Sequence, residues 1–286
     1  MTGAARTGTD ASGTGARAVW RPEDVARLEE PRIAAGVSSV AVESGAWLGG
    51  VMCRAEPGSW VNQALGGVGM NGETPSEDDI AALRGFFEPH GIEPKVEVTP
   101  FVTKAFWRAM GEAGFRVKAV EALFSCVLEG WEPAIAAPAG VVVRAIDKDD
   151  EAAVERACRF GHRAFAGVEP NEGDMRTLRA MFAFEGSHGL AAEIDGELVG
   201  IGMTDVIGEV AALYFGCTHA DYRRRGVQTA LLLARLAHAK SLGSKVATIG
   251  GEPSQATERN ALRVGFTPCY SKVALVRPGE GLQTSQ

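Results

Sequence analysis

Three consecutive arginines precede a glycine in the segment Asp221–Leu231, which reads DYRRRGVQTAL. An apolar run at residues 210–215 comes shortly before this segment, and a helical pattern continues from it to Lys240. The order predicts a strand, a tight basic turn and the first turn of a helix. Free N–H groups and the positive dipole end at such a helix start favour an anion, and a diphosphate fits this geometry. Gly226 permits close approach of the ligand, and the arginines add charge and forked hydrogen-bond donors.

The basic turn resembles the acetyl-CoA pyrophosphate loop of the GNAT family of N-acetyltransferases, whose pattern is Arg/Gln-x-x-Gly-x-Gly/Ala. Arg223, Gly226 and Gln228 occupy the three defined positions, although glutamine stands where glycine or alanine is usual. The alternative is an ordinary strand-to-helix junction with solvated arginines. The resemblance implies a cofactor-binding segment made of Arg223, Arg224, Arg225, Gly226, Val227, Gln228, Thr229 and Ala230.

The length of 286 residues suggests two domains of ordinary size, and a hydrophobic content of 45% allows a sizeable core. The net charge of −7 argues against a general nucleic-acid binder, which needs basic surface against phosphate. This charge is compatible with a cationic substrate, although solubility alone also explains a charge of this size.

The five cysteines lie without Cys-x-x-Cys spacing, and the histidines show no metal-ligand spacing. The pattern indicates neither a disulfide framework nor a metal site, and it favours a reducing, cytoplasmic compartment. No apolar run approaches the length of about 18 residues that a membrane span needs. Residues 1–19 are rich in Gly, Ala and Thr, and we predict them to be a disordered tail.

The C-terminal half alternates strand and helix patterns in an order typical of a mixed α/β sheet. Short β-branched or alternating segments predict strands, and charged or periodic segments predict helices. The Asp-Gly pair at residues 195–196 predicts a hairpin turn between two of the strands. The expected strands are residues 140–144, 189–193, 198–203, 209–217, 245–249 and 266–276, and the expected helices are residues 147–166, 172–184, the segment from the basic turn to 240, and 254–264.

This order, β-α-α-β-β-β-α-β-α-β, is similar to that of the GNAT acyl-CoA N-acyltransferase fold. A late Arg-Asn…Gly-Phe…Tyr pattern at residues 259–270 is similar to one found in part of the family. The more widespread family asparagine would fall at Ser254, which departs from the pattern. The resemblance covers roughly residues 140–277, which we predict to be the catalytic domain.

The N-terminal half contains a weak repeat of the C-terminal end. Residues 109–128 and residues 262–276 both read as a short helix, a Gly-Phe pair and a closing strand. Upstream of the first copy, residues 75–87 read as a helix with Thr74 as N-cap and Glu77 as capping-box partner.

The segment before this helix, residues 66–73, has no arginine and is followed by acids, so it would repel a pyrophosphate. We therefore predict residues 20–135 to be a second, degenerate GNAT-like domain without a cofactor loop, followed by a linker at residues 133–139. Tandem GNAT proteins with one degenerate half are a known arrangement, and this chain resembles one. The alternative is an unrelated α+β domain in which the second Gly-Phe pair occurs by chance.

The resemblance implies direct transfer of an acetyl group from acetyl-CoA to an amine, with no metal. It also implies that the main chain at Cys217 and Thr218 pairs with the pantetheine arm and polarises the thioester carbonyl. Asn260 would contact the CoA arm from the opposite side, or serve only as a helix-terminus residue. A covalent intermediate on Cys217 is a further hypothesis, but a cysteine in an apolar strand is more often a core residue.

No proton-transfer residue carries over from the family, because Ala261 stands where many members have a tyrosine. Glu209 and Tyr214 on the central strand are the candidate catalytic residues. A strand-start charge and a core aromatic are the simpler interpretations of these two side chains. Further candidates outside that strand are Tyr270, His162 and Glu169.

We therefore expect an acetyl-CoA-dependent N-acetyltransferase that acts on a primary amine of a small molecule or peptide by direct attack in a ternary complex. Two alternatives are a non-catalytic acetyl-CoA sensor and a transferase that uses a different acyl donor. No nucleic-acid or membrane partner is expected. Strand edges in GNAT folds often pair, which leaves a homodimer open.

Overall fold

The computed structural model describes residues 20–284. Two compact units make up this part of the chain. Residues 124–268 form the C-terminal unit, and residues 22–123 together with residues 269–284 form the N-terminal unit. The predicted tail at residues 1–19 lies outside the described residues. Within the described residues, no helix is long and apolar enough to cross a bilayer.

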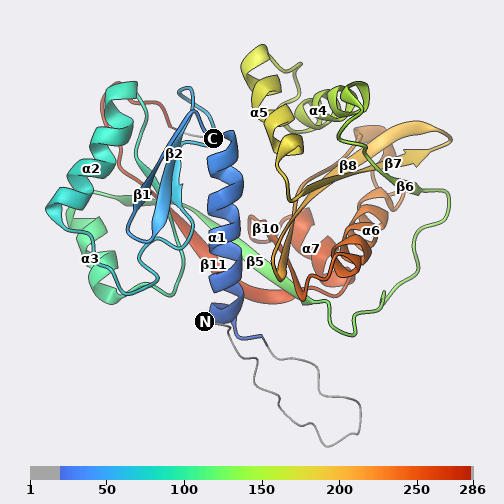
Figure 1. Ribbon diagram of the computed structural model, residues 1–286, viewed down its shortest axis with the longest axis horizontal. Helices are drawn as coiled ribbons and strands as arrows, with labels where there is room; N and C mark the ends of the chain where they lie inside the picture. Colours follow the sequence, from blue (N-terminus) through green and yellow to red (C-terminus); the bar gives the residue numbers. More distant parts are fainter. Residues whose placement is uncertain (1–19, 285–286) are drawn as a thin grey trace, which may run out of the picture. The chain divides into compact units, whose positions relative to one another are not determined.

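The C-terminal unit is a mixed sheet with helices on both faces (Figure 1). Its strands are the end of β5 (Arg116–Val127), β6 (Val142–Ala145), β7 (Ser187–Ile194), β8 (Glu197–Ile207), β9 (Val210–Thr218) and β10 (Val246–Gly251). Its helices are α4 (Glu151–Ala166), α5 (Glu172–Ala183), the short helix η2 (Ala220–Tyr222), α6 (Val227–Ser241) and α7 (Ala256–Arg263).

The strand order in this unit is β5-β10-β9-β8-β7-β6. Strands β6 to β9 pair antiparallel, and β10 runs parallel to β9. Alternation along β7 sends Leu190 and Ile194 into a core with Leu231 of α6. On the other face, a Cβ atom at Gly189 would lie 2.7 Å from the ring of Phe182 in α5. The sheet therefore has α6 on one face and α5 on the other, and the element order is the predicted one.

Local sequence signals explain where several of these elements begin and end. The Asp150 side chain accepts the N–H of Ala153 at the start of α4, and the helix stops at Gly167 with φ 72°. Between β7 and β8, Asp195 and Gly196 have φ values of 53° and 83°, as a tight hairpin turn requires. The predicted Asp-Gly turn is confirmed.

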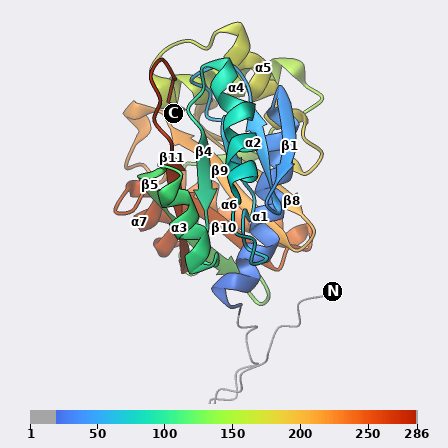
Figure 2. The same cartoon turned by 90° about the vertical axis from the view of Figure 1, so that its left-hand side faces the viewer.

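The N-terminal unit has the strand order β1-β2-β3-β4-β11-β5. Its further strands are β1 (Glu43–Trp47), β2 (Gly50–Arg54), β3 (Gln63–Leu65), β4 (Lys95–Val98) and β11 (Thr267–Val276). Its helices are α1 (Pro22–Val40), α2 (Glu77–Phe87), the short helix η1 (Glu88–His90) and α3 (Lys104–Glu112). Figure 2 shows α2 and α3 in front of these strands. Leu83, Phe87 and Phe106 from the helices pack with Val96 and Val98 of β4 in one buried cluster.

The start of α2 differs from the predicted one by two residues. Ser76, not Thr74, is the N-cap, and its hydroxyl accepts the N–H of Asp79. The Asp79 carboxylate returns a bond to the N–H of Ser76, so Asp79 is the capping-box partner in place of Glu77. Thr74 and Glu77 have suitable side chains and the same three-residue spacing, so spacing alone does not distinguish the two pairs, and the helix begins at Glu77.

The two Gly-Phe segments of the internal repeat adopt the same local structure. Gly114 follows α3 with φ 84°, and Gly265 follows α7 with φ 104°. Each glycine is followed by a buried phenylalanine and then by a long strand, β5 or β11. The repeat predicted from the sequence is therefore a structural repeat.

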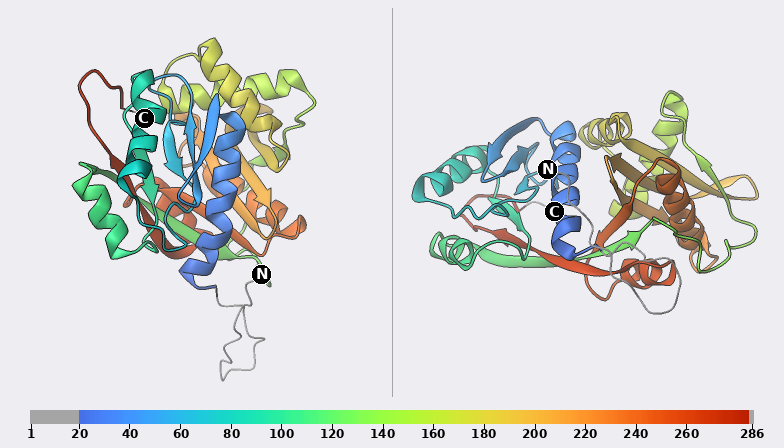
Figure 3. Two further views of the ribbon diagram at one scale, coloured as in Figure 1. Left: turned by 60° about the vertical axis from the view of Figure 1, so that its left-hand side comes forward. Right: turned by 60° about the horizontal axis from the view of Figure 1, so that its bottom comes forward.

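The closing strands β5 and β11 lie side by side (Figure 3). The end of β5, from residue 124, belongs to the C-terminal unit, and β11 from residue 269 belongs to the N-terminal unit. In the N-terminal unit β11 pairs antiparallel with β4, where Val273 is opposite Val98. The grouping of β11 with the N-terminal unit differs from the predicted boundaries of 20–135 and 140–277. The pairing of β11 with β4 joins segments far apart in the sequence, and such a pairing leaves no local pattern from which to predict it.

Candidate functional site

Strands β9 and β10 separate part of the way along their length. Their parallel pairing runs from Val210 and Val246 to Ala212 and Thr248. Strand β9 nevertheless continues to Thr218, and β10 continues to Gly251. In the part of the chain that the structure describes, the main-chain groups on this edge of β9 beyond Ala212 therefore lack a strand partner and are open to a ligand.

A β-bulge in β9 accompanies this separation. Met203 of β8 is opposite Tyr214, whereas Ile201 is opposite Cys217, so β9 carries one extra residue. Phe215 lies in this interval with φ 47°, which is uncommon for a bulky residue. Bulges bend a strand and re-aim its groups. The bulge therefore interrupts the β8–β9 ladder at Phe215 and Gly216, and pairing resumes with Cys217 opposite Ile201 and Thr218 opposite Gly200.

A cleft of about 730 Å³ lies at the end of β9 where the two strands have separated. Its walls come from α4, from β9, from the basic loop with the start of α6, and from α7. The lining residues are Ala164, Phe165, Gly216, Cys217, Thr218, Tyr222, Arg223, Arg224, Gly226, Val227, Gln228, Thr229, Ala256, Thr257, Asn260 and Arg263.

The start of α6 presents uncapped N–H groups to this cleft. Gly226 is the N-cap residue, no side chain caps the helix, and the first turn contains no acid. The first helical bond joins the N–H of Ala230 to the carbonyl of Gly226, which leaves the preceding N–H groups without helical acceptors. An anion would satisfy these groups and the helix dipole together.

Helix α2, at the corresponding place in the N-terminal unit, has the opposite character. Its N-terminus is closed by the Ser76 and Asp79 capping box, and its first turn holds the acids Glu77, Asp78 and Asp79. An anion there would be repelled by three carboxylates, and the N–H of Asp79 is already bonded to the Ser76 side chain. The start of α6 is therefore suited to a diphosphate, and the start of α2 is not.

The loop before α6 requires glycine at position 226. Gly226 has φ 84°, and a Cβ atom there would lie 2.6 Å from Cβ of Pro138. Arg224 also has a positive φ, 63°, and lines the cleft together with Arg223. The Arg225 guanidinium instead lies 4.9 Å from the centroid of the Tyr222 ring, outside the cleft lining.

Polar side chains without partners point to a polar ligand at this site. The hydroxyl oxygen of Thr218 and the amide oxygen of Gln228 are both buried, and neither has a hydrogen-bond partner among the described residues. Buried polar atoms in folded proteins are nearly always paired. Across the cleft, Asn260 accepts a hydrogen bond of 3.1 Å from Arg263, which adds a third lining arginine. These donors and acceptors suit a ligand with phosphates and amide groups.

Most of the predicted cofactor residues meet in the cleft. The lining includes Cys217, Thr218, Arg223, Arg224, Gly226, Val227, Gln228, Thr229 and Asn260. Arg225 lies outside it, and Ala230 is buried within α6. Arg263 was not predicted, although its position three residues after Asn260 on a helix places both on one face. Phe165 was also missed, because its nearness to β9 depends on tertiary packing.

Glu209 does not reach the cleft. It lies in the turn between β8 and β9, and its carboxylate pairs with the exposed ammonium of Lys245. A strand advances about 3.3 Å per residue, so Glu209 and Cys217 are about 25 Å apart at opposite ends of β9. The structure therefore removes Glu209 as a catalytic candidate, and the simpler interpretation as a strand-start charge holds.

Tyr214 lies at the start of the bulge, outside the cleft lining. Its hydroxyl donates to the buried carboxylate of Asp205 at 2.7 Å and is 3.2 Å from the hydroxyl of Ser187. Tyr270, a further candidate, lies in the N-terminal unit and donates to Glu30 at 2.9 Å. Of the tyrosines considered for proton transfer, only Tyr214 adjoins the site.

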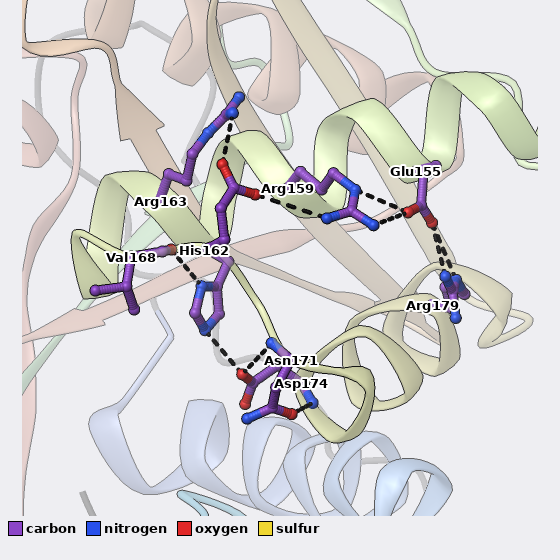
Figure 4. Close-up of polar contacts among 9 residues, drawn as sticks. Glu155, Arg159, His162, Arg163, Val168, Asn171, Asp174 and Arg179 are labelled. Atoms are coloured by element: carbon purple, nitrogen blue, oxygen red, sulfur yellow. Dashed lines mark hydrogen bonds and ion pairs between the residues drawn. The ribbon is translucent and has the colours of Figure 1, made fainter.

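His162 belongs to a polar cluster that joins α4 to α5 (Figure 4). Glu169 lies in the connection between these two helices and pairs with residues of α4. The His162 ring contacts the carbonyl of Val168 through Nδ1 at 3.0 Å and the carboxylate of Asp174 through Nε2 at 3.3 Å. Glu169 pairs with Arg163 at 3.0 Å. Neither residue lines the cleft, so both act here as structural contacts of the α4–α5 connection.

The Cys217 thiol lies at the cleft, and no histidine or carboxylate of the described residues acts on it. Burial raises the pKa of this thiol to about 12. The thiol is therefore protonated at neutral pH, which disfavours a nucleophilic role. Within the described residues, no group of three or more His, Cys, Asp or Glu side chains is arranged as a metal site.

Comparisons with known proteins agree with this geometry. Residues 156–266 match the model of the Acetyltransferase (GNAT) family. A search of curated protein sequences found no match.

Solved structures share the fold at low sequence identity. A GCN5-related N-acetyltransferase from Kribbella flavida superposes with a TM-score of 0.65 at 15% identity, covering 90% of this chain and 96% of its own. A tandem GNAT protein from the clavulanic acid biosynthesis pathway gives a TM-score of 0.58 at 15% identity. The superposition covers 94% of this chain and 91% of that protein. A GNAT-family acetyltransferase from Novosphingobium aromaticivorans gives 0.53 at 18% identity, covering 88% and 99%. Residues 156–266 therefore form a domain of the GNAT acetyltransferase family, and the chain is an acyltransferase with the acyl-CoA N-acyltransferase fold.

Proposed function

We propose that this protein transfers an acetyl group from acetyl-CoA to a primary amine of a small molecule or peptide, by direct attack in a ternary complex. One observation carries the proposal. The uncapped start of α6, beside Arg223 and Arg224, opens into the same cleft as the unpaired edge of β9. The first feature suits a diphosphate and the second suits an amide-containing arm, and CoA contains both groups.

Each wall of the cleft has a role in this proposal. The N–H groups of residues 227–229 and the guanidinium groups of Arg223 and Arg224 would hold the diphosphate. The main chain of Cys217 and Thr218 would pair with the pantetheine arm and donate to the acyl carbonyl. Bound acetyl-CoA supplies an activated thioester, and the protein supplies orientation and polarisation.

Tyr214 is the proposed proton-transfer residue. It adjoins the bulge, and its hydroxyl is held by the buried carboxylate of Asp205. Ala261, which is buried, takes no part in proton transfer. The CoA thiolate leaves readily at neutral pH, so its protonation by Tyr214 needs to contribute little to the rate.

We assign the N-terminal unit as a degenerate GNAT-like half without a cofactor loop. Its strands β3 and β4 pair in parallel, as β9 and β10 do, and its helix α3 and strand β5 repeat α7 and β11. The capping box at Ser76 and the acids after it take the place of a phosphate site.

A thermal-shift titration with acetyl-CoA and with CoA tests the cofactor proposal. A ligand at about 100 times its dissociation constant stabilises the native state by about 2.7 kcal/mol. We expect the double change Arg223→Ala and Arg224→Ala to weaken binding about tenfold or more, because charge-assisted hydrogen bonds are lost. Arg225→Ala is the matched control, since this neighbouring arginine lies over Tyr222 outside the cleft lining. An equal loss in both variants, or no shift in the native protein at millimolar ligand, would refute the assignment.

Release of free CoA thiol against a panel of primary amines then tests the reaction. The second candidate function is an acetyl-CoA sensor, which is favoured by the alanine at position 261. A sensor would bind acetyl-CoA and release no CoA with any amine. Competition of acetyl-CoA with longer acyl-CoAs tests whether acetyl is the preferred group.

A further inference from the structure

Arg235 of α6 is the largest fully buried side chain in the described part of the molecule, with 0% of its surface exposed. Its guanidinium donates to the carbonyls of Met203 and Tyr214 at 3.2 Å, and its Nε donates to the carbonyl of Leu231 at 3.3 Å. Met203 and Tyr214 are opposite each other in the β8–β9 ladder at one edge of the bulge. Arg235 therefore joins α6 to the two strands where the ladder becomes irregular.

No carboxylate pairs with this buried cation among the residues that the structure describes. Its Nη2 atom is buried and has no hydrogen-bond partner within residues 20–284. Burial lowers the pKa of the guanidinium to about 10, so it still carries its charge at neutral pH. A buried unpaired charge is costly, and a neutral apolar side chain would fill the same space at lower cost.

Two glycines leave room for the guanidinium under the sheet. A Cβ atom at Gly202 of β8 would lie 2.8 Å from Cζ of Arg235. A Cβ atom at Gly216 of β9 would lie 3.1 Å from its Nη2 atom. Gly216 also lines the cleft, so the cation lies directly beneath the cleft wall.

We propose that Arg235 is a positioning residue for acyl transfer, which fixes the β9 bulge so that the main chain of residues 216–218 meets the acyl carbonyl in a donating orientation. This inference rests on the proposed function. One terminal nitrogen, Nη1, donates to both carbonyls of the irregular ladder, and Nε donates to the carbonyl of Leu231. Two nitrogens of one rigid plane thus fix the orientation of the side chain, which the single nitrogen of a lysine ammonium cannot do in the same geometry. The positive charge also lies beneath the strand segment where negative charge develops on the carbonyl oxygen.

Acetyl-CoA labelled with ¹³C at the acetyl carbonyl provides a probe that needs no acceptor. Hydrogen bonds to the carbonyl lower its infrared stretching frequency, and we expect a downward shift when the native protein binds the probe. In Arg235→Lys and in Gly202→Ala we expect at least half of this shift to be lost. Binding of CoA, which has no acyl group and is held mainly by the α6 loop, should change by less than about threefold, within the range of one ordinary hydrogen bond.

Gly202→Ala keeps the arginine and displaces only its guanidinium, so it decides the question if Arg235→Lys fails to fold. Gly189→Ala is the matched control, because it crowds Phe182, Ile146 and the sulfur of Met203 on the opposite face of the same sheet and does not touch the guanidinium. We expect it to lower thermal stability while the native carbonyl shift is kept.

Two results would overturn this inference and make Arg235 a packing residue. The first is an infrared shift of the acetyl carbonyl in both test variants that is as large as in the native protein. The second is a loss of this shift in Gly189→Ala that equals the loss in the test variants. No carbonyl shift in a native protein that binds acetyl-CoA would overturn it as well. A native protein that does not bind acetyl-CoA would instead overturn the proposed function, so the two failures are distinguishable.

Discussion

The ring of Phe215 lies in the space left by Gly161 of α4. A Cβ atom at position 161 would come within 2.4 Å of Cε1 of that ring. The ring also stacks on Phe165, with centroids 5.2 Å apart and planes 21° from parallel. Phe215 is the bulge residue with the positive φ, so α4 holds the bulge from one face of the sheet while Arg235 holds it from the other.

Gly161→Ala should therefore displace the bulge. We expect a loss of stability of about 1–3 kcal/mol from overpacking. We also expect CoA release to slow by about tenfold or more, because small misplacements of reacting groups are costly. Steady-state kinetics with thermal melting measures both effects. Gly85→Ala in α2 is the control, since a Cβ there meets nothing within 4 Å and should add up to about 1 kcal/mol through helix propensity. Native kinetics in Gly161→Ala would refute the coupling.

Gly226→Ala should abolish most of the CoA affinity. The substitution meets both a positive φ and a contact of 2.6 Å with Pro138. Gly243, at the other end of α6, has φ 87° and open space around it, so Gly243→Ala carries the backbone strain without the clash. We expect both variants to lose about 1 kcal/mol of stability from strain. Only Gly226→Ala should lose the thermal shift with CoA, and equal titrations for the two would contradict the loop assignment.

Lys272 is a buried cation that holds together the carboxylates of the N-terminal unit. Its ammonium lies 3.1 Å from Glu30 and 2.8 Å from Glu97. We expect Lys272→Met to cost about 3–5 kcal/mol, because it leaves buried carboxylates without a counter-charge. Lys245→Met, which breaks the exposed pair with Glu209, should leave the stability almost unchanged, because water screens an exposed ion pair. Denaturant unfolding measures both values.

A triple variant with Lys272→Met, Glu30→Gln and Glu97→Gln sharpens this prediction. It removes the cation and the two carboxylates that it contacts, so much of the stability lost in Lys272→Met should return. If the triple variant is less stable than Lys272→Met alone, lost packing rather than unpaired charge explains the effect.

Glu121 should make the stability of the N-terminal unit depend on pH. Burial, with a further contribution from the charge of Glu97, raises the pKa of Glu121 to about 7. A carboxyl whose pKa is raised by folding contributes stability below its unfolded pKa, and this contribution is lost as the pH rises through 7. The free energy of unfolding of the native protein should therefore fall between about pH 5 and pH 8. Glu121→Gln lacks this titration, so its free energy of unfolding should rise by about 1–3 kcal/mol relative to that of the native protein over the same interval. Unfolding at the two pH values measures this difference, and a gain toward acid pH would contradict the assignment.

Cys217 should be chemically inert in the folded protein. Burial raises its pKa to about 12, whereas Cys269 is only partly buried. We expect iodoacetamide at pH 7.5 to modify Cys269 before Cys217, as peptide mass spectrometry would reveal. Incubation with acetyl-CoA without an acceptor should leave no acetyl group on Cys217. A stable acetyl-cysteine at this position would instead support the covalent alternative.

Local patterns in the sequence were sufficient for the helices and strands of the C-terminal unit and for the basic turn between β9 and α6. The strand, basic turn and helix of residues 210–240 are encoded in consecutive residues, and so are the Asp-Gly hairpin and the Gly-Phe repeat. Hydrophobic period, capping and turn chemistry act over a few residues, so one sequence reveals them. For the same reason, most of the predicted loop residues do line the cleft.

Only the tertiary structure decided which distant residues meet. Glu209 immediately precedes β9 and Cys217 lies near the end of that strand, so extended geometry places them far apart. The bulge at Phe215, the place of Arg235 beneath it, and the grouping of β11 with the N-terminal unit all depend on contacts between segments far apart in the chain. Such contacts are selected by packing and by the satisfaction of buried main-chain groups. Those forces act on the folded whole and leave no periodic trace in the sequence.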